Sequence, residues 1–115
     1  MSSNAQVRRR AVQAARGESP FDLLLIDAQI VDMATGEIRP ADVGIVGEMI
    51  ASVHPRGSRE DAHEVRSLAG GYLSPGLMDT HVHLESSHLP PERYAEIALT
   101  QGTTAVFWDP HELAN

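Results

Sequence analysis

The sequence predicts an α/β fold in which a small sheet-forming segment precedes the first two strands of a (β/α)8 barrel of the TIM type. Three observations lead to this prediction. Short aliphatic runs with turn residues between them fill the chain up to about residue 71. A strand, helix, strand pattern follows in residues 72–108. Polar side chains come after each of its two strands, where parallel α/β folds bind ligands.

Composition excludes several classes of protein. The 115 residues carry 9 basic and 16 acidic side chains, a formal net charge of −7 and no cysteine. An acidic balance argues against a nucleic-acid binder, and the absence of cysteine rules out disulfides and thiolate metal ligands. No apolar run approaches the ~18 residues that a membrane span needs. We therefore expect a cytoplasmic protein that binds neither nucleic acid nor membrane.

Residues 1–20 are predicted to form an N-terminal helix. Val7, Ala11, Ala14 and Ala15 recur at helical spacing, and Gly17 supplies a stop signal. The same segment is rich in arginine and has no acidic residue before Gly17, which is also typical of an organelle transit peptide. Of the two interpretations we favour the plain helix.

Residues 21–71 are predicted to contribute several short strands. The strands are expected at residues 21–31, 42–46, 49–53 and 65–68, with a tight hairpin turn at residues 47–48. Such close spacing indicates a small antiparallel sheet. The polar stretch 54–64 is expected to be a surface loop, in which His54 and His63 are solvated and bind no metal.

The stretch 76–87 carries the candidate metal site. In an extended strand alternate side chains share a face, so Asp79, His81, His83 and Glu85 are expected on one side. Two imidazoles at positions i and i+2 can share one divalent ion, each through one ring nitrogen. We therefore predict His81 and His83 as metal ligands. Asp79 could orient them or could make only a structural hydrogen bond.

The helix and strand that follow complete the strand, helix, strand unit. Prolines and an acidic residue open a helix at residue 90, and residues 101–102 end it. Residues 103–108 are β-branched and aromatic, which predicts a buried strand. Trp108 is expected to be a core residue and not a base-stacking one, and His88 is expected to face solvent.

Acidic and imidazole side chains follow the second strand as well. Asp109, His111 and Glu112 come directly after it, and the carboxyl ends of parallel strands meet at one edge of a sheet. We assign Glu85, His111 and Glu112 as candidate catalytic residues. A metal or substrate contact and a hydrogen-bonding or helix-capping role remain equally open for them.

The same motifs carry a family resemblance. They are the strand at residues 22–26, Ala-Gly at 69–70, Pro-Gly-Leu-Met-Asp-Thr-His-Val-His at 75–83, Leu-Glu-Ser-Ser at 84–87, Gly-Thr-Thr at 102–104 and Asp-Pro-His-Glu-Leu-Ala-Asn at 109–115. Together with the arginine-rich helix before the first strand, they resemble the opening of the amidohydrolase superfamily of metal-dependent hydrolases, and within it the adenine deaminase family.

The resemblance implies both a fold and an activity. Residues 21–71 would supply strands of a β-sandwich assembled from both chain ends, and residues 72–115 would begin the barrel. The implied reaction is hydrolysis of a small-molecule substrate, adenine, to hypoxanthine and ammonia in purine salvage. The implied cofactor is a divalent, commonly binuclear metal centre, with manganese or iron favoured and zinc possible. His81 and His83 match the family's first-strand metal ligands, and a homo-oligomer is expected.

A barrel needs ~250 residues, so we expect this chain to be an incomplete N-terminal portion of an enzyme. Because a catalytic metal usually has three protein ligands and an open position, the portion by itself is expected to be inactive. One alternative is another amidohydrolase that acts on cyclic amides or N-acetyl groups. An alternative of a different class is a non-catalytic, β-rich interaction module.

Overall fold

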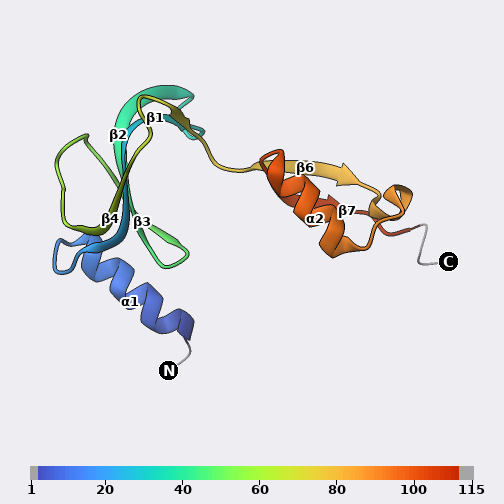
Figure 1. Ribbon diagram of the computed structural model, residues 1–115, viewed down its shortest axis with the longest axis horizontal. Coiled ribbons are helices and arrows are strands. Elements are labelled where there is room, and N and C mark those ends of the chain that lie inside the picture. Colours follow the sequence, from blue (N-terminus) through green and yellow to red (C-terminus); the bar gives the residue numbers. More distant parts are fainter. Residues whose placement is uncertain (1–2, 112–115) are drawn as a thin grey trace. The chain divides into compact units, whose positions relative to one another are not determined.

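The structure is a computed structural model that describes residues 3–111 (Figure 1). Its contacts divide the chain into two compact units, Met1–Ser74 and Pro75–Asn115, and each is described by itself. Within the described residues no helix combines the length and the apolar character that crossing a membrane requires.

The first unit begins with the predicted helix. Helix α1 spans Ser3–Ala15, and its buried alanines, Ala11 and Ala14, face the sheet, where the helix packs on strands β2 and β3. Gly17 adopts a left-handed conformation with φ of +78°. Its N–H donates to the Ala14 carbonyl, so the helix ends where the glycine predicts.

One mixed sheet makes up the rest of this unit. Its strands are β1 (Phe21–Asp32), β2 (Glu37–Val46), β3 (Met49–His54), β4 (Ala62–Ser67) and β5 (Tyr72–Leu73). The order is β3-β2-β1-β4, with β5 also paired to β1. Strands β1, β2 and β3 pair antiparallel, as predicted, whereas β4 and β5 run parallel to β1. The prediction of a purely antiparallel sheet is therefore wrong.

The parallel pairing follows from the path of the chain after β3. The connection of residues 55–61 carries it from β3, at one edge, to the far side of β1, where a new strand can run in the direction of β1. Proline and glycine in that connection indicate a loop but not its destination. Strand β4 also begins three residues earlier than expected, so that exposed His63 lies on it.

A small core joins the helix to the sheet. Phe21, Leu24 and Val46 are fully or almost fully buried and cluster with the two helix alanines. Gly44 lies directly under the Phe21 ring, since a Cβ atom there would come within 2.5 Å of the ring atom Cε1. Only glycine therefore fits this position of β2 without displacing the largest core side chain.

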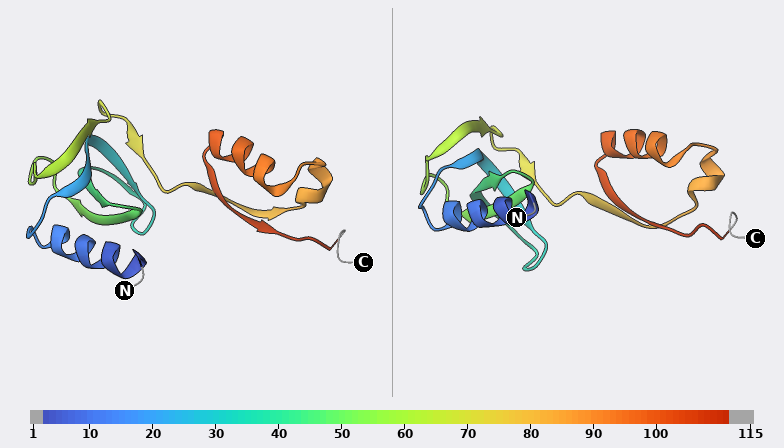
Figure 2. Two further views of the ribbon diagram at one scale, coloured as in Figure 1. Left: turned by 60° about the horizontal axis from the view of Figure 1, so that its bottom comes forward. Right: turned by 90° about the horizontal axis from the view of Figure 1, so that it is seen from below.

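The second unit contains the predicted strand, helix, strand arrangement. Its elements are β6 (Leu77–Val82), the 3-10 helix η1 (Leu84–Ser87), α2 (Pro91–Thr100) and β7 (Thr103–Trp108). Strands β6 and β7 pair in parallel, and α2 lies along one side of the pair (Figure 2). The α/β character and the parallel start of the barrel are confirmed.

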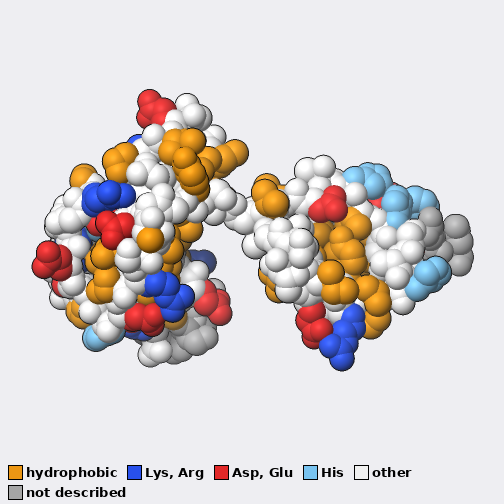
Figure 3. Space-filling view, turned by 45° about the horizontal axis from the view of Figure 1, so that its top comes forward, with side chains coloured by type: hydrophobic (Ala, Val, Ile, Leu, Met, Phe, Trp, Pro, Cys, Tyr) orange, Lys and Arg blue, Asp and Glu red, His pale blue; other side chains and the backbone are white. Residues whose placement is uncertain are grey.

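Two expectations for this unit are wrong. Strand β6 ends at Val82, so Glu85 lies in η1 and not on the face of an extended strand. The strands are also less buried than predicted, with Met78 64% and Phe107 62% exposed. Helix α2 lies along one side of this pair of strands, and hydrophobic side chains remain exposed on the surface of the unit (Figure 3).

Asp22 contacts both the β2–β3 hairpin and helix α1 of the first unit. Its carboxylate accepts the Gly47 N–H at 2.7 Å and pairs with Arg10 of α1. The Gly47 N–H, with help from Arg10, lowers the pKa of Asp22 below its ordinary value. The carboxylate therefore stabilises the fold at pH values above that ordinary pKa, and this contribution is lost as the pH falls through the lowered pKa of the folded state.

We expect Asp22→Asn to lower the free energy of unfolding at neutral pH by about 1 kcal/mol. Urea unfolding at pH values from 7 down to 3 measures the free energy of unfolding of the variant and of the unsubstituted protein. The difference between the two free energies should shrink below about pH 4. Glu48→Gln, an exposed change in the same hairpin, is the control. A difference that is constant across this range would contradict the assignment.

Candidate metal centre

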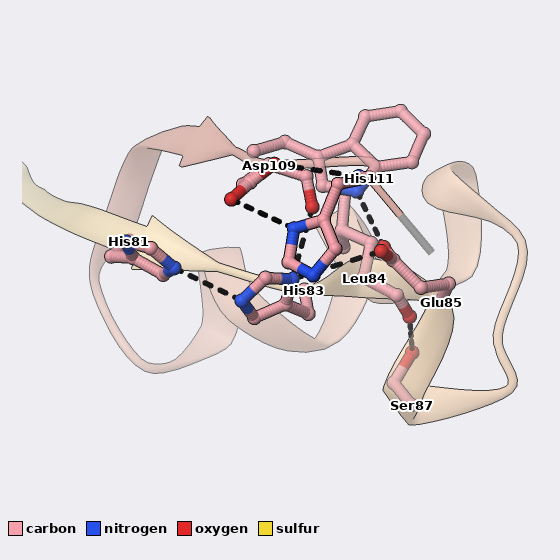
Figure 4. Close-up of polar contacts among 8 residues, drawn as sticks. His81, His83, Leu84, Glu85, Ser87, Asp109 and His111 are labelled. Carbon is pink, nitrogen blue, oxygen red and sulfur yellow. Dashed lines mark hydrogen bonds and ion pairs between the residues drawn. The ribbon is translucent and has the colours of Figure 1, made fainter. Parts of the chain in front are cut away.

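Two imidazole rings converge at the end of β6. Nε2 of His81 and Nε2 of His83 lie 3.0 Å apart, so the two side chains share a side as the strand alternation predicted (Figure 4). Asp79 does not contact either ring in a described hydrogen bond. Its carboxylate accepts the backbone N–H of His81 at 3.1 Å, which is the structural alternative of the two considered for it.

The tautomer of His83 follows from its second nitrogen. Nδ1 of His83 lies 3.0 Å from the backbone carbonyl oxygen of Asp109. A carbonyl oxygen only accepts hydrogen bonds, so Nδ1 carries the proton and Nε2 carries the lone pair. The lone pair therefore points toward His81, into the space where the two rings meet. Orientation of one ring nitrogen by a hydrogen bond at the other is typical of metal-binding histidines.

Asp109 joins the two histidines because β7 runs parallel to β6. Val82 is paired with Trp108, and the Asp109 N–H donates to the Val82 carbonyl at 3.0 Å. The carboxyl ends of both strands thus meet at one edge. In the part of the chain that the structure describes, His81, His83 and Asp109 form the group whose ligand atoms lie within 4.8 Å of one another.

His111 contacts both Asp109 and His83. Its Nδ1 lies 3.0 Å from Asp109 Oδ2, and its ring packs edge-on against the His83 ring with centroids 4.7 Å apart. The hydrogen bond from His111 lowers the pKa of Asp109, which keeps this carboxylate ionised at neutral pH. The predicted catalytic residue His111 is therefore beside the histidine pair. The other candidate on this segment, Glu112, lies outside the described residues.

Glu85 reaches the same cluster from η1. Its side chain is 6% exposed, and Oε1 lies 3.7 Å from His83 Nδ1. Its other oxygen, Oε2, accepts the indole N–H of Trp108 at 2.8 Å. Trp108 was expected in the core, but it is 39% exposed and its polar edge belongs to this cluster. An indole offers only a donor, so a carboxylate is a natural partner for it.

The arrangement fits a divalent metal ion. Two imidazole nitrogens bound to one ion at about 2.05 Å each lie about 3 Å apart when the angle at the ion is near 95°. The observed Nε2 to Nε2 distance of 3.0 Å matches this spacing. Two neutral nitrogens and one ionised carboxylate are a donor set that suits zinc, manganese or iron. His81, His83 and Asp109 are therefore the side chains that would hold such an ion.

The remaining described histidines lie outside this cluster. His63 and His88 are exposed, as expected. His54 is half-buried, with its ring stacked on Phe21 and its Nδ1 2.9 Å from Ser52 Oγ. Burial lowers the pKa of His54, which favours a neutral ring. The expectation that His54 is solvated is wrong, because its ring stacks on the buried Phe21 ring.

Sequence reasoning placed Asp109 at the shared edge of the two strands without assigning it as a metal ligand, and it missed Trp108 as a polar partner. Asp109 had a signal, since it is the first residue after a predicted strand that runs parallel to the histidine strand. Trp108 had none, because its contact with Glu85 depends on the turn that η1 makes after β6.

We expect His81→Ala and His83→Ala, each made in the complete protein, to remove most of the bound metal. Loss of a partner that only orients a ligand costs about 10–100-fold in metal affinity or activity, so loss of a direct ligand should cost more. Metal content after gel filtration and activity are the measurements, and His63→Ala is the control. Unchanged metal content in both histidine variants would contradict the assignment.

The sequence of this chain is similar to those of known adenine deaminases. No protein-family model matches the chain. The chain is 99% identical over 115 residues to an adenine deaminase of Klebsiella pneumoniae subsp. pneumoniae, covering 100% of this chain and 19% of that protein. It is 69% identical over 108 residues to an adenine deaminase of Serratia proteamaculans, covering 94% of this chain and 18% of that protein.

Among solved structures, D-aminoacylase, which is described as defining a subset of amidohydrolases, matches with 33% identity and a TM-score of 0.63. The match covers 76% of this chain and 18% of D-aminoacylase. A second structure of D-aminoacylase, with the same values, concerns its binuclear metal center. The chain thus spans about a fifth of the length of the proteins that it matches. The chain is thus closely similar to about a fifth of the length of adenine deaminases, and it shares its fold with the amidohydrolase D-aminoacylase.

Proposed function

We propose that the complete protein hydrolyses adenine to hypoxanthine and ammonia with the help of a divalent metal. The observation that carries the proposal is the convergence of two imidazole Nε2 atoms, 3.0 Å apart, with the Asp109 carboxylate at neighbouring strand ends. The high identity of the chain to adenine deaminases supports the substrate. The activity is proposed for the complete protein because the chain spans about a fifth of those relatives.

The chemistry of the proposal divides between the ion and the protein. A divalent metal, when bound, lowers the pKa of a water molecule from 15.7 to about 7 and makes it a nucleophile at neutral pH. His81 and His83 would hold the ion through Nε2, and Asp109 would add a carboxylate donor. Deamination also requires a proton at a ring nitrogen and at the leaving ammonia, which positioned carboxylates and imidazoles can supply.

The candidate catalytic residues contribute in different ways. His111 hydrogen-bonds the Asp109 carboxylate and is 62% exposed at its side chain, so it can exchange protons with solvent and with Asp109. Glu85 is buried against His83 and Trp108, which suits a role in orientation better than one in proton transfer. Glu112 stays a candidate from sequence, next to His111.

Finer attributes of the complete protein belong to the same proposal. The metal centre is binuclear and contains manganese or iron, the protein is a cytoplasmic homo-oligomer, and the reaction serves purine salvage. Support for these comes from the family resemblance and, for the metal, from the nitrogen and oxygen donors of the site. The absence of cysteine restricts the donors in this chain to imidazole and carboxylate.

A second candidate function is hydrolysis of an N-acyl group. The 33% identity to D-aminoacylase favours it, because that enzyme shares the fold of this chain. The higher identity to adenine deaminases, 69% and 99%, makes deamination the first choice.

We expect the complete protein, loaded with Mn²⁺, to release ammonia from adenine and to be silent with hydantoin and N-acetylated sugars. Removal of the metal with a chelator should abolish the release, and renewed addition of Mn²⁺ should restore it, because the nucleophile depends on the ion. Coupled ammonia detection measures the rates, and hypoxanthine is identified by its ultraviolet spectrum. Turnover of an acylated or cyclic amide substrate without turnover of adenine would overturn the proposal.

A further inference from the structure

Glu85 and Trp108 form a contact that the metal-binding side chains do not explain. The side chain of Glu85 is almost completely buried, although it comes from a 3-10 helix of only four residues. A buried carboxylate is costly unless polar groups surround it. One of its oxygens accepts the Trp108 indole N–H at 2.8 Å, and the other faces His83 Nδ1 at 3.7 Å.

Glu85 lies beside the ring nitrogen of His83 that does not face the proposed metal. His83 directs Nε2 toward His81, whereas Glu85 faces the opposite nitrogen, Nδ1. Glu85 is also not a member of the described group of ligand atoms that lie within 4.8 Å of one another. The carboxylate is therefore behind the ring, where partners that orient metal-binding histidines are found.

The two acceptors behind His83 act together. The Asp109 carbonyl takes the hydrogen bond from Nδ1, and the Glu85 carboxylate adds a negative charge next to the same N–H. The distance of 3.7 Å is too long for a hydrogen bond, so the contact is electrostatic. Both favour the tautomer that leaves the lone pair on Nε2.

Trp108 fixes where that charge lies. It is the last residue of β7, and Asp109, whose carbonyl orients His83, is the next residue along the chain. The end of β7 therefore contacts the His83 ring directly through the Asp109 carbonyl. It also acts on the ring indirectly, through the Trp108 indole and Glu85. Because an indole nitrogen can only donate, its partner must be an acceptor.

We propose that Trp108 and Glu85 are a positioning pair for His83, in which the indole N–H holds the carboxylate and the carboxylate holds the ring with Nε2 toward the metal. The inference rests on the proposed metal-dependent function. In this proposal Glu85 orients His83 and does not bind the metal. Trp108 acts through its indole N–H, which donates to Glu85.

Two substitutions in the complete protein separate the members of the pair. Trp108→Phe removes the indole N–H and keeps an aromatic ring. Glu85→Gln keeps the size of the side chain but replaces one of its two acceptor oxygens by an amide donor. Glutamine can therefore still accept the Trp108 N–H, but it places no negative charge next to the His83 N–H.

The readout is metal affinity, measured by competition of the complete protein with a chelator for Mn²⁺, together with the spectrum of the Co²⁺-substituted protein. We expect each variant to bind Mn²⁺ about tenfold or more weakly. The double variant should lose no more than the weaker-binding single variant, because both changes act through the same ring. Tyr94→Phe, an aromatic change in α2 of the same unit, should leave the affinity unchanged.

Other results would overturn the inference. If both variants fold and bind Mn²⁺ as the unsubstituted protein does, the pair does not orient His83. If Glu85→Gln abolishes metal binding as His83→Ala does, Glu85 is a ligand. If the losses add in the double variant, the two residues act independently. Should Trp108→Phe not fold, the affinity and Co²⁺ spectrum of Glu85→Gln decide between these outcomes.

These measurements do not depend on adenine. Failure of the unsubstituted protein to bind a divalent metal, or to release ammonia from adenine, would count against the proposed function. Normal metal binding and turnover by the unsubstituted protein, with unaltered affinity in the variants, would count against the positioning pair alone.

Discussion

The arrangement of the candidate site depends on one constraint, the meeting of two imidazole Nε2 atoms at the end of β6. A separation of 3.0 Å allows a hydrogen bond from His81 Nε2 to the lone pair of His83, and it is also the spacing of two nitrogens that share one cation. The backbone carbonyl of Asp109 fixes the proton of His83 on Nδ1, so this ring presents the lone pair of Nε2 to its neighbour. The fold thus holds a pair of nitrogen ligands ready for an ion.

Parallel pairing of β6 and β7 is what makes this possible. It brings the carboxyl ends of two strands to one edge, and with them the Asp109 carboxylate, the Asp109 carbonyl and the Trp108 indole. The turn of η1 then returns Glu85 to the back of His83. Three elements therefore determine the position of one imidazole. Such redundancy is expected where a ligand must keep its orientation in the absence of the metal.

Local patterns predicted the parts of this structure that depend on neighbours in sequence. The alternation of side chains along a strand predicted that His81 and His83 share a side, and Gly17 predicted the end of α1. Features that depend on the path of the chain were missed or misjudged. Strand β4 is parallel to β1 because the connection before it leads to the far side of β1. Glu85 does not share a strand face with the histidines because the chain turns into η1 before it. The contacts of Trp108 and His54 depend on rings brought near by the fold.

The most direct test of the account is the position of a metal in crystals of the complete protein. Anomalous scattering at the zinc or manganese edge locates the ion independently of the surrounding atoms. The account predicts a peak about 2.0–2.2 Å from Nε2 of both His81 and His83. A metal that binds elsewhere, or that binds either histidine through Nδ1, would contradict it.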